Sequence, residues 1–175
     1  YVDDILAACN DTAWMQDFKA TLGARFKIED HGDLSQLLGM HISRDRSART
    51  ISTDQSKYVM DILVKHNMSD CKPSSLPMEQ GLMSGLAHMN SPLLTRMAKH
   101  VYPSLIDSLQ YAAVCTRLDV SSALSILGSA QANPTEAHLQ ALKKVVRYLK
   151  GTLEPRLTLG GGEATTASNS HASLM

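Results

Sequence analysis

The apolar residues near the start of the chain change from strand spacing to helical spacing. A short apolar stretch around the pair Asp3-Asp4 predicts a strand that turns back at this pair as a tight hairpin. Apolar residues at every fourth position, Trp14 and Phe18 among them, then predict an amphipathic helix over about residues 12–25 with Trp14 in the core. Apolar and charged residues alternate at positions 26–29, which predicts a short strand.

Two further strands and a second helix are predicted before the middle of the chain. Residues 34–43 are apolar enough for a half-buried strand, residues 44–48 form a polar turn, and residues 49–53 return as the partner strand. An amphipathic pattern predicts a helix that begins at about residue 53 and ends near Asn67. Residues 78–100 mix Met, Gly, Ser and His without a dominant period and are predicted to be a linker.

Three amphipathic helices are predicted in the second half of the chain. The first begins at Ser104, the second follows Asp119, and the third begins at Asn133-Pro134 and ends at Gly151. Helices of this kind, joined by short turns, can bury one common core. Residues 153–175 end in a run of Gly, Ser, Thr and Ala and are predicted to be a flexible tail. The predicted fold class is therefore α+β and mostly helical.

Composition narrows the class of protein. The chain has 175 residues with 17 basic and 17 acidic side chains, so nucleic-acid contacts must come from local clusters rather than from net charge. Three widely spaced cysteines without a Cys-x-x-Cys pair are typical of reduced thiols in an intracellular protein. No apolar run approaches the roughly 20 residues that span a bilayer, which predicts a soluble protein without a membrane partner.

The adjacent carboxylates Asp3 and Asp4 are the strongest chemical signal. Two like charges in a short apolar stretch repel each other and lose hydration unless a cation meets them. A turn lets neighbouring side chains converge on one ion, and a hard divalent cation with oxygen ligands, such as Mg²⁺, keeps both carboxylates ionised. For an arbitrary Asp-Asp pair, a polar turn without metal is the alternative interpretation.

The segment Tyr1-Val2-Asp3-Asp4 with Ile5-Leu6 resembles the catalytic hairpin of reverse transcriptases from copia-type retrotransposon polyproteins. Other segments similar to that family follow in the same order and cover about residues 1–152 together with the hairpin. The ordered set is more specific than any single motif. These segments are Phe26 to Ile42, Gln55-Ser-Lys-Tyr58, Cys71-Lys-Pro73, Thr116-Arg117 with Asp119, and His138 with the stretch from Arg147 to Thr152.

The resemblance implies RNA-directed DNA polymerisation by two-metal nucleotidyl transfer. It implies Mg²⁺ or Mn²⁺ as cofactor, an RNA or DNA template-primer, and deoxynucleoside triphosphates. Asp3 would be the principal metal ligand and Asp4 a secondary one. Two sets of residues would lie near the primer or the nucleotide: Tyr1 and Val2 beside the metals, and Leu38, Gly39, Met40 and His41 in the hairpin that holds the primer.

The resemblance also divides the chain into four parts. Residues 1–53 would be the end of a polymerase palm with the catalytic and primer-holding hairpins, and residues 54–100 a thumb-like helix and linker. Residues 101–152 would be a helical thumb or connection region before the tail at 153–175.

The family needs a further aspartate and a fingers region upstream, and a ribonuclease H domain normally follows. No residue of this chain matches that aspartate, and the chain opens at Tyr1 with the motif already under way. We therefore expect a fragment of a longer polyprotein that is inactive alone and whose partners include the rest of that polyprotein. Residence in a cytoplasmic particle and residence in the nucleus fit equally well.

A basic helix face is the second candidate for contact with nucleic acid. Lys143, Arg147 and Lys150 share one face of the last predicted helix, with Lys144 close by. Such a face can follow a phosphate backbone, and the alternative is an ordinary solvated face. His138 lies near the start of the same helix, where either a phosphate contact or a capping or packing role is possible, and the capping or packing role is favoured.

Two other classes of protein remain open at this point. One is a non-enzymatic helical binding or structural module that carries an acidic turn, and the other is a decayed transposon remnant. Leu118, Asp107 and Pro103 depart from the family pattern, which favours decay. Asp107 is expected on a packed helix, where burial of an unpaired carboxylate costs on the order of several kcal/mol.

Overall fold

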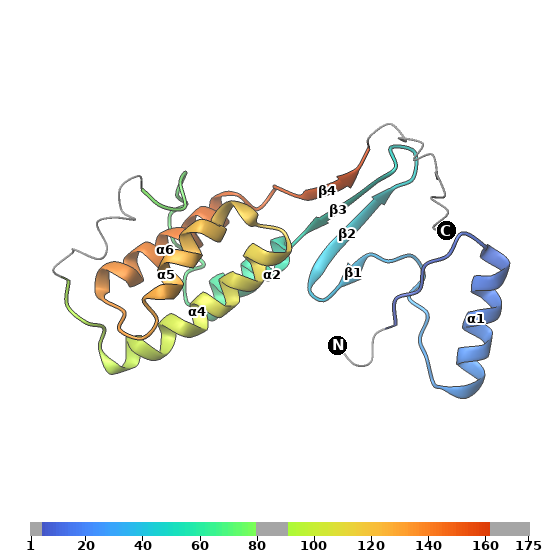
Figure 1. The fold of residues 1–175 in the computed structure, drawn as a ribbon, viewed down its shortest axis with the longest axis horizontal. Helices are drawn as coiled ribbons and strands as arrows, with labels where there is room; N and C mark the ends of the chain where they lie inside the picture. The colour runs from blue at the N-terminus through green and yellow to red at the C-terminus, as the bar shows by residue number, and fades with distance from the viewer. Residues whose placement is uncertain (1–4, 80–90, 162–175) are drawn as a thin grey trace, which may run out of the picture.

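The computed structural model describes residues 5–79 and 91–161. A bundle of four helices lies at one end, an antiparallel sheet extends from it, and a further helix stands apart beyond the sheet (Figure 1). About half of the described residues are helical. The predicted α+β class is confirmed, with a larger non-helical share than expected.

Helix α1 (Thr12–Arg25) has the predicted bounds but not the predicted packing. Asp11 caps it, because its Oδ1 accepts hydrogen bonds from the backbone N–H groups of Ala13 and Trp14. Its Trp14 stacks on Phe18 with ring centroids 5.2 Å apart, yet Trp14 is 54% exposed. The prediction of a core tryptophan is wrong, since no described element covers this face of α1.

The sheet is an antiparallel meander in the order β1-β2-β3-β4. Its strands are β1 (Gln36–Leu37), β2 (Met40–Asp45), β3 (Thr50–Asp54) and β4 (Leu157–Gly160). The predicted strand, turn and return over residues 34–53 are confirmed, with one extra turn inside the first strand. The predicted strand at 26–29 is wrong, because no described strand lies beside it to complete its hydrogen bonds.

Strand β4 corrects the prediction of a flexible tail from residue 153. It pairs with β3 in the register Ile51 with Leu159 and Ser52 with Thr158, and the two hydroxyls of the second pair lie 2.8 Å apart. Opposed residues share a face, so Ile51 and Leu159 lie on an apolar face and Ser52 and Thr158 on a polar one. Residues 162–175 of the predicted tail lie outside the described residues.

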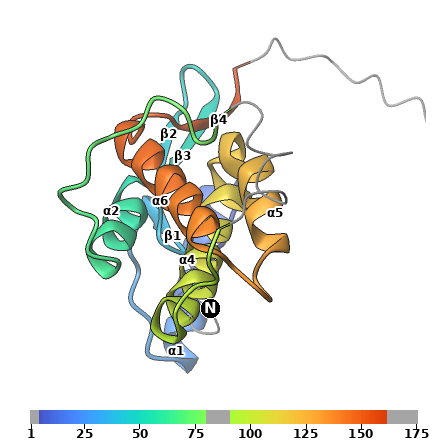
Figure 2. The same cartoon turned by 90° about the vertical axis from the view of Figure 1, so that its left-hand side faces the viewer.

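Helix α2 (Ser56–Lys65) packs in the bundle with α4 (Arg96–Cys115), α5 (Ser121–Ser129) and α6 (Glu136–Gly151). Figure 2 shows α6 among the other three, and it contacts each of them. The short helix η1 (Leu118–Val120) leads into α5. The predicted common core is confirmed, with α2 as its fourth member. Its most buried large side chains are Leu63, Tyr102, Leu105, Leu109, Leu124, Leu127, Leu142 and Leu149.

Helix α4 begins earlier than the predicted Ser104. Thr95 caps it by accepting a hydrogen bond from the backbone N–H of Ala98, so Pro103 lies inside the helix instead of near its start. Asp107 is exposed, and the expected cost of a buried carboxylate does not arise. The buried Tyr102 donates its hydroxyl to the Leu127 carbonyl at 2.7 Å, and burial raises the pKa of Tyr102 to about 12.

None of the helices in the described part of the chain has the length and apolar character needed to cross a bilayer.

Candidate functional site

The predicted metal-binding residues lie at the start of the chain, before the part that the structure describes. Asp3 and Asp4, with their neighbours Tyr1 and Val2, lie outside the described residues. Within residues 5–79 and 91–161, no group of three or more His, Cys, Asp or Glu side chains is arranged to hold a metal ion. The Mg²⁺ site at Asp3 and Asp4 therefore stays a prediction.

The predicted primer-holding residues Leu38, Gly39, Met40 and His41 form one compact hairpin between β1 and β2. Leu38 and Gly39 occupy the two turn positions with φ values of 51° and 76°. Both positions of a two-residue hairpin turn of this kind need positive φ, so Gly39 serves the turn itself. Leu38 adopts a conformation that a branched side chain rarely takes.

A tyrosine of the bundle holds this turn in place. Tyr111, on α4, donates its hydroxyl to the Leu38 carbonyl. Its ring packs edge-on against Tyr58 of α2, with centroids 5.1 Å apart, and Tyr58 donates its hydroxyl to the Ser108 carbonyl. The candidate primer hairpin is therefore anchored to two helices of the bundle.

Asp54 forms a second anchor, at the junction of β3 and α2. Its side chain is 9% exposed, and Oδ2 lies 3.1 Å from His41 Nδ1 and 3.5 Å from Arg156 Nε. Oδ1 accepts hydrogen bonds from the backbone N–H and hydroxyl of Ser56. Burial acts to raise the pKa of Asp54, but hydrogen bonds from His41 and Ser56 outweigh burial and leave it below its usual value. One carboxylate thus joins β2, α2 and the segment before β4.

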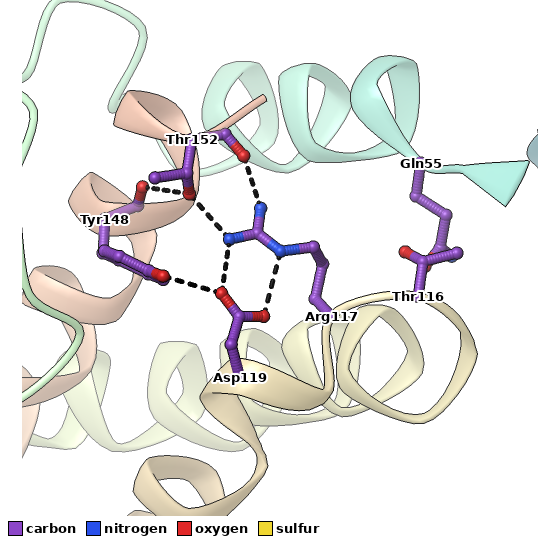
Figure 3. A network of polar contacts seen from close by, with 6 residues as sticks. All are labelled: Gln55, Thr116, Arg117, Asp119, Tyr148 and Thr152. Carbon is purple, nitrogen blue, oxygen red and sulfur yellow. Dashed lines mark hydrogen bonds and ion pairs between the residues drawn. The ribbon is translucent and has the colours of Figure 1, made fainter. Parts of the chain in front are cut away.

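The most connected polar group in the bundle is Arg117, which is only 4% exposed (Figure 3). Its Nε and Nη2 donate to the two oxygens of Asp119 at 3.0 and 2.8 Å, which is a bidentate pair. Its Nη1 and Nη2 also donate to the carbonyl and hydroxyl of Thr152, each at 2.6 Å. Arg117 thereby links the short helix η1, which leads into α5, to the end of α6.

Tyr148 completes this network from α6. Its hydroxyl donates to Asp119 Oδ2 at 2.7 Å, and the Arg117 guanidinium lies 5.5 Å from the centre of its ring. Burial acts to raise the pKa of Asp119, but Arg117 and Tyr148 lower it by more, so Asp119 stays ionised. The hydrogen bond to Asp119 raises the pKa of the Tyr148 hydroxyl. Beside it, Thr116 donates to Gln55 Oε1 at 2.8 Å.

The residues of the basic α6 face hold a neighbouring segment, residues 69–79, which we call the strap. Lys150 donates to the carbonyls of Ser69 and Cys71, and Arg147 donates to the carbonyl of Lys72 at 3.0 Å. Lys144 forms an ion pair with Glu79. Lys143 is half-buried. Three of the four cations that were predicted to bind the phosphate backbone of a nucleic acid thus have partners within the chain. Their contact with nucleic acid stays a prediction.

The end of α6 also needs a glycine where the strap passes. A Cβ built on Gly151 lies 3.0 Å from Pro73 Cβ and 3.3 Å from the Ser74 carbonyl oxygen. The segment Cys71-Lys-Pro73 therefore meets the stretch from Arg147 to Thr152 directly. Sequence reasoning grouped these motifs by resemblance, but their spacing along the chain carried no sign of their mutual contacts.

His138 has the capping role. Thr135 accepts a hydrogen bond from the His138 backbone N–H, and the Thr135 N–H donates to His138 Nδ1 at 3.2 Å. Because Nδ1 accepts, the imidazole is neutral in the folded chain. Burial lowers the pKa of His138, and it also lowers the pKa of His66, with a smaller contribution from Lys65.

The two histidines predict a loss of stability in mild acid. A histidine whose folded pKa lies below its unfolded value of about 6.5 binds protons more readily when unfolded. Its contribution to the stability of the fold is therefore complete above the unfolded pKa, and it is lost as the pH falls from there through the folded pKa. We expect a lower melting temperature at about pH 5.5 than at about pH 7.5. The carboxylates Asp54 and Asp119 have lowered pKa values, so they affect the melting temperature only in stronger acid.

Scanning calorimetry of wild type and His138→Gln at both pH values checks this prediction. Glutamine keeps a neutral acceptor at the capping position without a titrating group, so the variant should show a smaller pH dependence. His66 is unchanged in this variant, so its part of the pH dependence remains. A melting temperature that rises on acidification, or an unchanged pH dependence in His138→Gln, contradicts the assignment.

The comparison with known proteins agrees with the resemblance that the ordered sequence motifs indicate. Residues 1–80 match the family model described as reverse transcriptase (RNA-dependent DNA polymerase). The chain is 36% identical over 167 residues, 93% of its length, to the "Retrovirus-related Pol polyprotein from transposon TNT 1-94" of Nicotiana tabacum. It is 38% identical over 152 residues, 87% of its length, to the "Retrovirus-related Pol polyprotein from transposon RE1" of Arabidopsis thaliana.

These matches cover most of the chain but little of the polyproteins. The chain spans 12% of the tobacco polyprotein and 10% of the Arabidopsis polyprotein. It also spans 60% of the "Uncharacterized mitochondrial protein AtMg00810" of Arabidopsis thaliana, at 33% identity over 87% of its own length. No solved structure gives a significant match. The chain is therefore a relative of the reverse transcriptase region of retrotransposon Pol polyproteins, as its motifs predict.

Proposed function

We propose that this chain is the C-terminal part of the reverse transcriptase of a copia-type retrotransposon, and that its parent polyprotein copies an RNA or DNA template into DNA. The observation that carries this proposal is the family match over residues 1–80, which contains the acidic pair Asp3-Asp4. The names of the tobacco and Arabidopsis relatives, retrovirus-related Pol polyproteins, support it. They do not favour the alternative of an unrelated helical module.

In this proposal the residues of the chain divide into chemical and positioning roles. Asp3 and Asp4 would hold Mg²⁺ or Mn²⁺, and the bound ion would supply Lewis-acid and charge-stabilising chemistry for nucleotidyl transfer. Leu38, Gly39, Met40 and His41 present a fixed turn to the primer end. Tyr111 and Asp54 are positioning residues, because they anchor that turn to the bundle.

The remaining segments support this arrangement. Residues 1–53 are assigned to the end of the palm and residues 54–152 to a thumb or connection region. The partners are the template-primer, deoxynucleoside triphosphates, and the other regions of the polyprotein, with fingers and palm before this chain and ribonuclease H after it. The Arg117 network joins η1 to α6 and to Thr152 at its end, and so supports the bundle to which the hairpin is anchored.

Primer extension tests the proposal at two lengths of polypeptide. We expect a polypeptide that joins this chain to the preceding region of its polyprotein to extend a primer with deoxynucleoside triphosphates and Mg²⁺. Residues 1–175 alone are expected to give no extension, because the resemblance requires an aspartate that this chain does not match. Chelation by EDTA should stop the longer polypeptide, and Mg²⁺ or Mn²⁺ should restore it. Extension by residues 1–175 alone contradicts the proposal that this chain lacks a required aspartate of the catalytic site.

A further inference from the structure

Three exposed arginines surround the turn between β2 and β3. We call residues 44–50 the arginine turn, and its arginines are Arg44, Arg46 and Arg49. It is the end of the hairpin farthest from the bundle (Figure 1). A shallow recess of about 350 Å³ opens there, lined by Arg44, Asp45, Arg46, Arg49, Thr50 and Ile51.

The charge of the arginine turn is poorly neutralised. Its single carboxylate, Asp45, accepts hydrogen bonds through Oδ1 from the Ser47 hydroxyl and from the backbone N–H groups of Ser47 and Ala48. Arg46 lies 3.8 Å from Asp33, but both side chains are mostly exposed, so the pair is weak. Among the described residues, no carboxylate forms an ion pair with Arg44 or Arg49.

The backbone of Arg49 adopts a left-handed conformation within the arginine turn. Arg49 has a φ of 55°, in the left-handed region where Gly or Asn is favoured. Its carbonyl accepts a hydrogen bond from the Gly161 N–H, which holds this conformation.

We propose that the arginine turn binds the phosphate backbone of a nucleic acid. Guanidinium groups donate paired hydrogen bonds to phosphate oxygens, and the three of them line one recess that no described residue fills. The cations of the α6 face, in contrast, mostly hold the strap. The choice of nucleic acid as the ligand rests on the proposed function.

The position of the arginine turn sets the part of the nucleic acid that it can reach. It lies at the opposite end of the six-residue strand β2 from the Leu38-Gly39 turn. A strand of that length spans roughly 20 Å. With the Leu38-Gly39 turn at the primer end, as proposed above, the arginine turn would reach the backbone of the same duplex several nucleotides away.

Binding of residues 1–175 to a fluorescent RNA–DNA primer-template duplex, measured by anisotropy at several salt concentrations, tests this inference. Arg44→Gln, Arg46→Gln and Arg49→Gln together should weaken binding on the order of tenfold and reduce the salt slope by about 3. The matched control combines Lys57→Gln, Arg96→Gln and Lys99→Gln, which remove the same charge from exposed positions on α2 and α4. We expect this control to bind within about twofold of wild type.

Arg49→Gly separates binding from folding. Glycine adopts positive φ without strain, so this variant should keep or raise the melting temperature while it weakens binding. Equal losses in the two triple variants, wild-type binding in the arginine variant, or no binding by wild type each overturn the inference. If arginine-dependent binding is found but the longer polypeptide makes no DNA, the proposed function fails and the inference stands.

Discussion

Arg117→Met is expected to lower the free energy of unfolding by about 2 kcal/mol, because it removes a buried guanidinium and the hydrogen bonds that it donates, while its partner Asp119 is 40% exposed and can be hydrated. The substitution removes every hydrogen bond that Arg117 makes to Asp119 and Thr152. It leaves the Thr152 carbonyl without its donor and Asp119 without its cation. Methionine has a similar length, so loss of packing contributes little. Urea denaturation followed by circular dichroism measures the change.

Two further variants make this prediction specific. Arg96→Met removes an exposed arginine from the start of α4 and should change the stability by less than about 0.5 kcal/mol. Combining Arg117→Met with Asp119→Leu should cost less than the sum of the two single changes, because the pair is removed as a unit. A stability of Arg117→Met within about 0.5 kcal/mol of wild type contradicts the structural role of the network.

Asp3→Ala in the longer polypeptide is expected to lower primer extension by roughly a thousandfold or more. Loss of a metal ligand removes several kcal/mol of transition-state stabilisation, and about 4 kcal/mol corresponds to a thousandfold change in rate. The matched control is Asp61→Ala, an aspartate on the exposed side of α2. It should extend primers at the wild-type rate. Single-turnover extension with saturating nucleotide measures the chemical step in both variants.

The local sequence pattern predicted well those helices in which apolar residues recur along the whole length of one face. In α6 the buried residues keep three-and-four spacing, and the helix lies close to its predicted bounds. The first turns of α4 carry few buried side chains, so their pattern resembled a linker and the start was misplaced. Trp14 had the spacing of a core residue, but spacing does not show whether another element covers the face.

Contacts between distant segments could not be predicted from spacing. Strand β4 pairs with a strand about a hundred residues earlier, and four residues alone carry no strand signal that outweighs the Gly-rich stretch after them. Arg117 and Thr152 were noted as members of separate motifs, yet no local rule indicates that one donates to the other. The resemblance singled out several short motifs, and the structure shows that residues of different motifs bind each other.

In the proposed function, Asp3 and Asp4 carry the chemistry while the Arg117 network supports only the fold. Primer extension as a function of temperature tests it most directly, with wild type, Asp3→Ala and Arg117→Met compared in the longer polypeptide. We expect Arg117→Met to match wild type in the cold and to lose activity at a lower temperature, and Asp3→Ala to be inactive throughout. Wild-type activity in Asp3→Ala, or no activity in Arg117→Met at temperatures where it is folded, contradicts the account.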